Sequence, residues 1–140
     1  MPGLYKERTC PNCGKIKRMH PDQLCCSQTC ASELARKDKI NRWLLGEEIK
    51  TSRGKTSTAR WIRDYMLEQS NFKCSKCNWG ETNLFTGKIP LELEHKDGNF
   101  MNNKIDNLEV LCPNCHALTA TYKGANKSAG RPRAKYYRGT

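Results

Sequence analysis

Apolar residues recur at helical spacing in one stretch of the first half of the chain, and an earlier basic stretch is another possible helix. Ser32–Leu45 predicts one helix, and Thr58–Gln69 predicts a second, which Ser57 or Thr58 can cap with a side-chain oxygen. Four apolar side chains of the second helix fall on one stripe: Trp61, Ile62, Tyr65 and Met66. Such a stripe is typical of a helix face that packs against a core, so we expect these residues to be buried.

A different pattern covers the second half of the chain. Residues 91–94 alternate apolar and acidic side chains and predict a short strand that ends at His95. Residues 96–104 are polar and rich in Asp, Gly and Asn, which form turns. Residues 108–111 predict a second strand, and a proline at the start of 113–122 suits the first turn of a helix. The order strand, loop, strand, helix predicts a small α+β fold.

Little apolar material is available for a core, because only 36% of the residues are hydrophobic and the mean hydropathy is −0.83. Nine cysteines are candidates for additional stabilisation. The N-terminus lacks the apolar run of a signal peptide, and no stretch of about 18 apolar residues could span a membrane. We therefore expect a cytoplasmic protein in a reducing compartment, where paired cysteines usually bind metal.

The formal charge of +11 lies on the flanks of the chain. Residues 57–122 carry a net charge of −1, whereas residues 1–35, 36–56 and 123–140 carry +2, +4 and +6. Basic flanks around a near-neutral module favour a polyanionic partner such as nucleic acid, although they could serve solubility alone. We interpret the four segments, in chain order, as a cysteine-rich module, a basic connector, a central domain and a basic tail.

Two Cys-x-x-Cys knuckles enclose most of the central domain. Cys74-Ser-Lys-Cys77 and Cys112-Pro-Asn-Cys115 are separated by 34 residues, so a substructure must loop out between them. Each knuckle presents two thiolates to one ion, and two knuckles complete the tetrahedron that zinc prefers. A structural zinc contributes about 10–16 kcal/mol of apparent binding free energy. We predict that a zinc site of four cysteines stabilises this domain in place of a larger hydrophobic core.

The N-terminal cysteines predict a second zinc site with one cysteine left over, so that residues 1–35 form a zinc-binding module. We expect four ligands: Cys10, Cys13, Cys26 and Cys30. Cys26-Ser-Gln-Thr-Cys30 could open a helix that turns both thiolates toward the metal, and Cys25 would then point elsewhere. Two alternatives remain open. Cys25 could replace Cys26, or His20 could supply a ligand, although a histidine beside Pro21 is typical of an exposed loop.

One stretch of the chain resembles the HNH, or ββα-metal (His-Me finger), endonuclease family. It reads Leu93-Glu-His-Lys-Asp-Gly-Asn-Phe-Met-Asn-Asn-Lys-Ile-Asp-Asn-Leu-Glu-Val-Leu-Cys-Pro-Asn-Cys-His116. His95, Asn107 and His116 stand twelve and nine residues apart, and with the knuckles the resemblance covers residues 72–122. The chain looks most like small phage and mobile-element members, some of which carry a zinc module ahead of the nuclease. The resemblance implies that residues 57–122 form a nuclease domain with a ββα-metal core.

The resemblance implies a role for each matched residue. His95 would be the general base, since imidazole titrates near neutral pH and can accept a proton from water. Glu94 and His116 would hold one divalent ion. Successive residues of a strand point to opposite sides, so Glu94 could face the metal while His95 faces water. Asn107 would orient His95 through hydrogen bonds to the backbone across the loop, although an isolated asparagine at this place is typical of a turn.

Two departures from the family leave the catalytic ion open. The first metal position is often Asp or His, whereas this chain has Glu94, a carboxylate that still suits Mg²⁺ or Mn²⁺. Some members add a third ligand one helical turn after His116, where this chain has Ala120, with Thr119 nearby as a weak donor. We expect water and substrate phosphate to complete the shell. Asp97 is a further acid, which we interpret as a loop-shaping residue.

The C-terminal tail contains Gly130-Arg131-Pro132-Arg133, which is similar to the core of an AT-hook. Such a segment can lie in the narrow minor groove of A·T-rich DNA. The alternative is a plain basic tail that binds phosphates without sequence preference. We expect four tail residues to contact DNA: Lys127, Arg131, Arg133 and Lys135.

Together these patterns predict a metal-dependent DNA endonuclease with two structural zinc ions and one catalytic ion, Mg²⁺ or Mn²⁺. Its partner would be double-stranded DNA, and the family implies 5′-phosphate and 3′-hydroxyl ends. A double-strand break would need a homodimer or two successive nicks made in separate binding events. The protein would act in the cytoplasm, that of a host cell if a phage encodes it. Two alternatives remain: a non-catalytic zinc-finger DNA-binding protein, and a packaging-associated nuclease that needs a partner.

Deleting residues 124–140 is expected to weaken DNA binding and to flatten its salt dependence, because the deletion removes five basic side chains. If about three of them touch phosphate at once, the slope of log K against log salt falls by about 3 units for duplex DNA. Binding isotherms over a salt series measure that slope, and an unchanged slope would contradict the prediction. Arg131→Ala should weaken binding to A·T-rich duplexes more than to G·C-rich ones; equal losses would leave only a plain basic tail.

Overall fold

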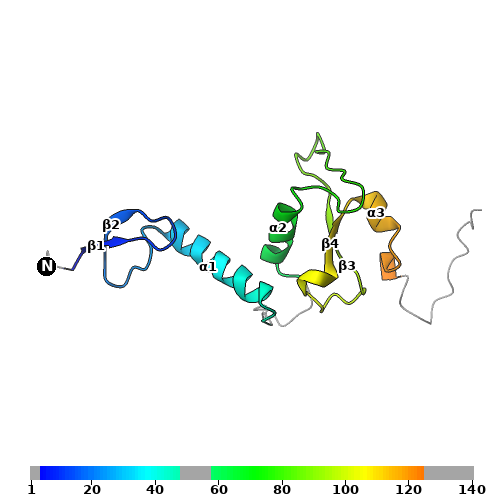
Figure 1. Ribbon diagram of the computed structural model, residues 1–140. Coiled ribbons are helices and arrows are strands. Elements are labelled where there is room, and N and C mark those ends of the chain that lie inside the picture. The colour runs from blue at the N-terminus through cyan, green and yellow to red at the C-terminus, as the bar shows by residue number, and fades with distance from the viewer. Residues whose placement is uncertain (1–3, 48–57, 125–140) are drawn as a thin grey trace, which may run out of the picture. The chain divides into compact units, whose positions relative to one another are not determined.

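The computed structural model describes residues 4–47 and 58–124 (Figure 1). Its residues fall into two compact units, of which the first holds the N-terminal residues together with 59–65 and the second holds Thr58 and residues 66–124. The predicted DNA contacts of the tail and the predicted cap Ser57 lie outside the described residues. None of the described helices is long and apolar enough to cross a membrane.

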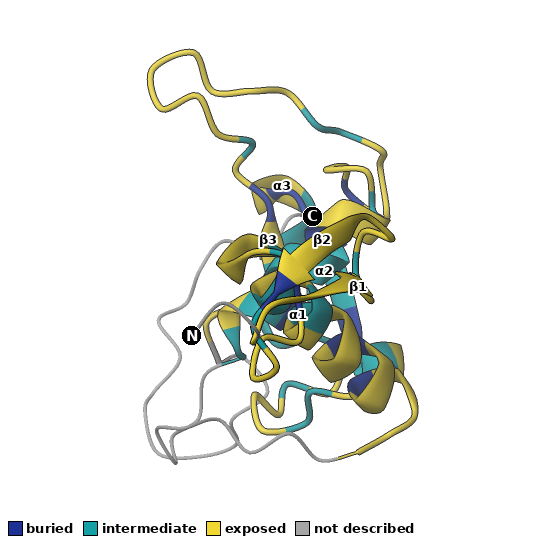
Figure 2. Cartoon of the chain, turned by 90° about the vertical axis from the view of Figure 1, so that its left-hand side faces the viewer, coloured by how far each residue is buried: buried dark blue, intermediate teal, exposed yellow. Residues whose placement is uncertain are grey.

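The first unit opens with a hairpin that the sequence pattern did not predict. Strands β1 (Lys6–Thr9) and β2 (Ile16–Met19) pair antiparallel, and most of their residues are exposed, so no apolar alternation marks them (Figure 2). The first Cys-x-x-Cys sequence forms the turn. The N–H of Gly14 donates to the carbonyl of Cys10 at 2.9 Å, and Gly14 adopts a φ of +71°, a conformation that costs glycine little.

Helix α1 (Gln28–Leu44) confirms the first predicted helix but begins four residues earlier than expected. Ser27 is its N-cap, and its hydroxyl accepts a hydrogen bond from the N–H of Cys30 at 3.2 Å. The helix therefore begins inside the second cysteine pair of this unit. Along its length it buries only Ile40 and Trp43.

The second unit confirms the small α+β fold. Strands β3 (Glu92–His95) and β4 (Leu108–Leu111) pair antiparallel, with Glu92 opposite Leu111 and His95 opposite Leu108. The short helix α3 (Pro113–Ala117) follows β4 directly and contacts both strands (Figure 1). Two 3₁₀ turns, Ile105–Asn107 and Tyr122–Gly124, complete the elements. The buried core consists of Leu67, Cys74, Leu91, Val110, Leu111 and Cys112.

Helix α2 (Arg60–Gln69) confirms the second predicted helix, and the division between the two units falls inside it. Of the predicted stripe, Ile62 is buried, with 3% of its surface exposed, while Trp61, Tyr65 and Met66 are half-buried. Within the first unit, the rings of Trp61 and Tyr65 lie edge-on to that of Trp43, with centroids 5.8 and 5.7 Å away.

The predicted helix over residues 113–122 is much shorter in the structure, and that prediction was wrong in extent. Helix α3 ends at Ala117. The hydroxyl of Thr119 donates to the carbonyl of His116 at 2.9 Å, and so occupies an acceptor that the next helical turn would use. Threonine side chains compete with the helix backbone in this way. The chain therefore leaves the helix before residue 120.

Each set of four predicted zinc ligands is brought together in the structure. The sulfur atoms of Cys10, Cys13, Cys26 and Cys30 lie within 4.8 Å of one another, as do those of Cys74, Cys77, Cys112 and Cys115. Sulfurs at the corners of a tetrahedron, each about 2.3 Å from zinc, would be about 3.8 Å apart. The observed Sγ–Sγ distances of 3.5 Å for Cys26–Cys30 and 3.6 Å for Cys77–Cys112 fit such a site.

Backbone N–H groups favour the thiolate at one cysteine of each cluster, whereas hydrogen bonds with neighbouring cysteine side chains raise the pKa of Cys26 and that of Cys115 to about 12. Hydrogen bonds from the backbone N–H groups of Cys26 and Cys13 lower the pKa of Cys10 from 9.0 to about 6. Burial opposes ionisation of Cys74, but backbone N–H donors, led by that of Cys112, lower its pKa to about 6. Since a thiolate is the form that binds metal, both clusters have the donor chemistry of a zinc site. Cys25 is outside the N-terminal cluster, and its burial raises the pKa of its thiol.

Cys74→Ser and Cys112→Ser are each expected to reduce the zinc content by one ion per chain and to unfold the second unit, because both remove a corner of a cluster that also belongs to the core. Elemental analysis and circular dichroism of the purified protein measure the two effects. Cys25→Ser is the matched control and should keep two zinc ions. Loss of one zinc from Cys25→Ser, with none from Cys26→Ser, would contradict the N-terminal ligand set.

Candidate functional site

The junction between β4 and α3 positions His116. Cys112 caps α3, and its sulfur accepts a hydrogen bond from the N–H of Cys115 at 3.4 Å. His116 follows the last cysteine of the knuckle, and its own N–H donates to the carbonyl of Cys112 at 2.9 Å. The cysteine cluster therefore fixes the start of the helix that carries this histidine.

Glu94 approaches His116 from strand β3. Its Oε2 atom lies 2.9 Å from His116 Nε2, and the two side chains are 12% and 20% exposed. Two ligand atoms that each lie about 2.1 Å from one ion, at right angles, are about 3 Å apart. The pair thus fits two neighbouring positions around one divalent ion. Among the described residues, groups of three or more converging ligand atoms occur only in the cysteine clusters.

Glu92 holds the other side of the His116 ring, and sequence reasoning missed it. Its Oε2 atom lies 2.8 Å from His116 Nδ1. Glu92 and Glu94 are two residues apart in one strand, so both point to the same face. That spacing was visible in the sequence and could have identified Glu92. The ring of Tyr122 meets the imidazole edge-on, with centroids 5.3 Å apart.

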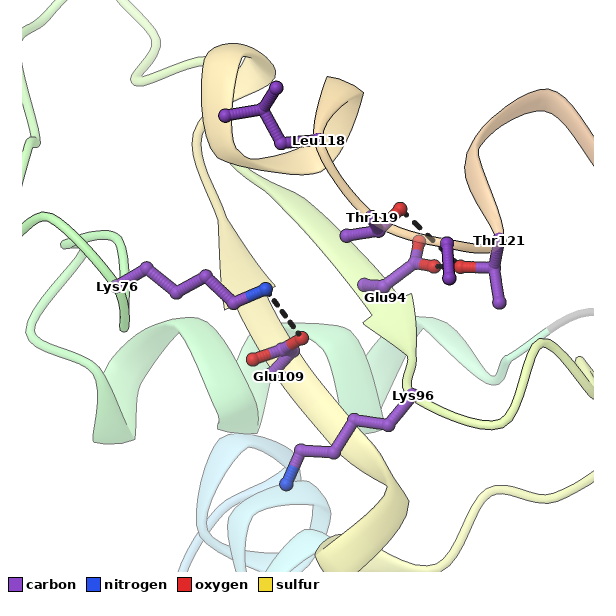
Figure 3. A pocket seen from close by; sticks show the side chains of 8 residues that line it. Lys76, Glu94, Lys96, Glu109, Leu118, Thr119 and Thr121 are labelled. Carbon is purple, nitrogen blue, oxygen red and sulfur yellow. Dashed lines mark hydrogen bonds and ion pairs between the residues drawn. The ribbon is translucent and has the colours of Figure 1, made fainter. Parts of the chain in front are cut away.

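Two threonines lie beside Glu94, as Figure 3 shows. The hydroxyl of Thr121 donates to Glu94 Oε1 and lies 3.4 Å from the hydroxyl of Thr119. Sequence reasoning named Thr119 as the nearby donor, whereas the residue that contacts the carboxylate is Thr121. Thr121 could not be identified beforehand, because it reaches Glu94 only where α3 ends early.

A pocket opens next to Glu94 and contains two lysines (Figure 3). Lys76, from the first knuckle, places its Nζ atom 3.6 Å from Glu109 Oε1, and the ammonium of Lys96 donates to the carbonyl of Asp106 at 2.8 Å. Glu109 faces Glu94 directly across the hairpin. Ammonium groups beside a carboxylate pair offer donors to phosphate oxygens, which accept charge-assisted hydrogen bonds.

His95 is the last residue of β3, and its ring contacts two residues that sequence reasoning did not select. Its Nε2 atom lies 3.0 Å from Asn103 Oδ1 and 3.4 Å from Thr58 Oγ1. The Thr58 hydroxyl in turn donates to Asn103 Oδ1 at 3.0 Å. Asn103, in the loop, and Thr58, two residues before α2, therefore both hold the ring, although they lie far apart in the sequence.

Asn107 closes the loop that follows His95. Its side-chain amide donates to the carbonyl of Asn102 at 2.8 Å and to Asp97 Oδ1 at 2.9 Å, and its own Oδ1 accepts from the N–H of Asp97 at 3.1 Å. Its carbonyl accepts from the N–H of Lys96. Asn107 therefore holds the loop that follows His95, and its role in orienting the His95 ring stays a prediction.

The chain is similar to two curated proteins. It is 59% identical over 54 residues to the "H-N-H endonuclease F-TflIV" of Escherichia phage T5. The resemblance to the HNH endonucleases is confirmed. The chain is also 32% identical over 75 residues to the "Zorya protein ZorE" of Escherichia coli.

Both similarities are partial. The aligned residues make up 39% and 54% of this chain, and they cover only 23% and 20% of the phage and bacterial proteins. No protein-family model matches the chain, and no solved structure matches it. The similarity to the HNH endonuclease therefore concerns a segment, whereas the two cysteine clusters and the strand–loop–strand–helix order are seen in the structure itself.

The loop between β3 and β4 contains a carboxylate whose ionisation depends on its hydrogen bonds. Asp97 accepts hydrogen bonds from the Asn102 amide, the Asn99 N–H and the Asn107 amide, and these lower its pKa below the ordinary 3.8. A lowered pKa in the folded state stabilises the loop above the ordinary value, and that stabilisation is lost as the pH falls through the folded-state pKa.

We expect an NMR titration of the Asp97 carboxyl to show a midpoint below 3.8, and Asn107→Ala to raise it, because the substitution removes one of the three donors. Asn41→Ala, which changes an exposed asparagine of α1, is the control and should leave the midpoint unchanged. A midpoint that does not respond to Asn107→Ala would contradict the loop-holding role of Asn107.

Proposed function

We propose that this chain is a metal-dependent DNA endonuclease in which Glu94 and His116 hold one divalent ion and His95 is the general base. One observation carries the proposal: Glu94 Oε2 lies 2.9 Å from His116 Nε2, and Glu94 is the residue immediately before His95. The similarity of 54 residues to an H-N-H endonuclease supports it. A zinc-finger protein without catalysis would need neither this pair nor the adjacent histidine.

A divalent ion at the Glu94–His116 pair would act as a Lewis acid for the charge that develops on the scissile phosphate and the leaving oxygen. His95 would take the proton from the attacking water, a step in which a well-placed base contributes about 100- to 10,000-fold. Asn103 and Thr58 would hold the imidazole, since both contact its Nε2 atom. Asn107 would keep the loop in place behind it.

The donor atoms of Glu94 and His116 suit Mg²⁺ or Mn²⁺ better than they suit a structural zinc ion. The pair offers one carboxylate oxygen and one imidazole nitrogen, which leaves several positions for water and phosphate oxygens. The cysteine clusters offer four sulfurs and leave no such positions. We therefore assign two structural zinc ions to the clusters and one exchangeable divalent ion to Glu94 and His116.

The substrate we propose is double-stranded DNA. Lys76 and Lys96 line the pocket beside Glu94, and the chain carries a formal charge of +11. Positive charge draws in a polyanion and makes its binding sensitive to salt. We retain the division into a zinc module, a basic connector, a nuclease domain and a basic tail as part of this proposal, and place its action in the cytoplasm. Because each chain has one proposed active site, one binding event would cut one strand. A double-strand break would then need a homodimer or two separate binding events.

His95→Ala is expected to lower the rate of plasmid cleavage by about 100- to 10,000-fold, because it removes the base and no metal ligand. The measurement is the conversion of supercoiled plasmid to nicked and linear forms with Mg²⁺, with Mn²⁺ or with EDTA. The matched control is His20→Ala, which changes a histidine of the N-terminal unit and should cleave like the wild type.

DNA binding and zinc content should be unchanged in His95→Ala, which separates a lost base from a lost fold. Cleavage by His95→Ala within a few-fold of the wild-type rate would contradict the assignment of the base. A wild-type protein that binds DNA but leaves the plasmid supercoiled with every metal would contradict the proposed activity and favour the DNA-binding alternative.

A further inference from the structure

The imidazole of His116 is held between two carboxylates of the same strand. Glu92 Oε2 lies 2.8 Å from Nδ1, and Glu94 Oε2 lies 2.9 Å from Nε2. The two ring nitrogens point in different directions, so an ion bound at Nε2 next to Glu94 would lie on the side of the ring away from Glu92. An ion bound at Nε2 would therefore be shared with Glu94 and not with Glu92.

We propose that Glu92 is a positioning residue that prepares His116 to bind the divalent ion, an inference that rests on the proposed function. An ionised carboxylate can only accept a hydrogen bond, so Glu92 keeps the imidazole proton on Nδ1 and leaves the lone pair of Nε2 toward Glu94. Histidines that bind metal usually donate their other N–H to such a partner. Loss of the partner typically weakens metal affinity by about 10- to 100-fold.

The surroundings of Glu92 support this role over that of an ordinary surface residue. Its side chain is 53% exposed and faces no part of the buried core, so packing does not require a carboxylate there. Its Cα lies opposite Leu111, one residue before the knuckle that leads to His116. Strand pairing thus brings Glu92 to the helix start. Tyr122 meets the ring edge-on, which leaves the imidazole little freedom to turn.

The test measures the affinity for Mn²⁺ directly, on the full chain with its zinc sites loaded and without DNA. Free Mn²⁺ is counted by electron paramagnetic resonance during a titration, for the wild type and four variants. Glu92→Ala removes the acceptor, and Glu92→Gln keeps an acceptor oxygen but loses the charge. His116→Ala removes a proposed ligand, so the Mn²⁺ binding that this variant loses is the binding that belongs to the site. Glu81→Ala removes an exposed glutamate of the same unit and is the control.

We expect Glu92→Ala to weaken Mn²⁺ binding by about 10- to 100-fold, and Glu92→Gln to weaken it less, because an acceptor for Nδ1 remains. Glu81→Ala should bind as the wild type does. Raising the Mn²⁺ concentration should restore plasmid cleavage by Glu92→Ala, since Glu94, His95 and His116 are all still present.

Two results would overturn the role of Glu92. Mn²⁺ affinity of Glu92→Ala equal to that of the wild type would show that His116 needs no partner. An equal and complete loss of binding in Glu92→Ala and Glu92→Gln, not restored by Mn²⁺, would make Glu92 a direct ligand. A wild-type protein whose Mn²⁺ binding is the same as that of His116→Ala would instead contradict the proposed function.

Discussion

The convergence of four sulfurs from two knuckles is the constraint on which the second unit depends. Cys74 and Cys112 belong both to the cluster and to the buried core, which is otherwise built from only a few apolar side chains. The N–H of Ser75 also donates to the carbonyl of Val110 at 2.8 Å, so that the first knuckle is bound to strand β4. The cluster thus joins the two ends of the segment that contains the strands and the loop. Without the cluster, the burial of so few apolar side chains would offset little of the conformational entropy that the chain loses on folding.

The same constraint positions the candidate catalytic residues. Because the second knuckle is also the start of α3, the cysteine cluster fixes His116 directly. The β3–β4 register then brings Glu92 and Glu94 to the imidazole, while His95 continues into the loop. A slip of one residue in that register would turn both glutamates to the other face of the hairpin. The structural cluster and the proposed ion site are therefore parts of one arrangement, although their donors suit different metals.

The sequence predicted the elements with strong local signals and missed those that depend on distant contacts. Strand β4 was predicted at its observed bounds, because its apolar residues are buried together. The choice of Cys26 over Cys25 followed from the geometry of a helix start, which Ser27 provides as a cap. The exposed strands β1 and β2 have no apolar pattern to reveal them. Helix α3 was predicted too long, because the contact of Thr119 with His116 is made only after the chain turns.

The same contrast between local sequence signals and distant contacts applies to the residues of the candidate site. Glu94, His95, Asn107 and His116 were selected by their spacing, and the structure brings Glu94 to His116 and Asn107 to the loop after His95. Their partners Thr58, Asn103 and Thr121 come from separate segments and carry no motif, so only the folded chain identifies them.

In the proposed site, His116 would bind the divalent ion and His95 would not. Pulsed electron paramagnetic resonance of bound Mn²⁺ tests it by detecting nitrogen nuclei coupled to the metal. We expect one coupled imidazole nitrogen, which disappears in His116→Ala and persists in His95→Ala. A coupling that persists in His116→Ala, or that disappears in His95→Ala, would contradict it.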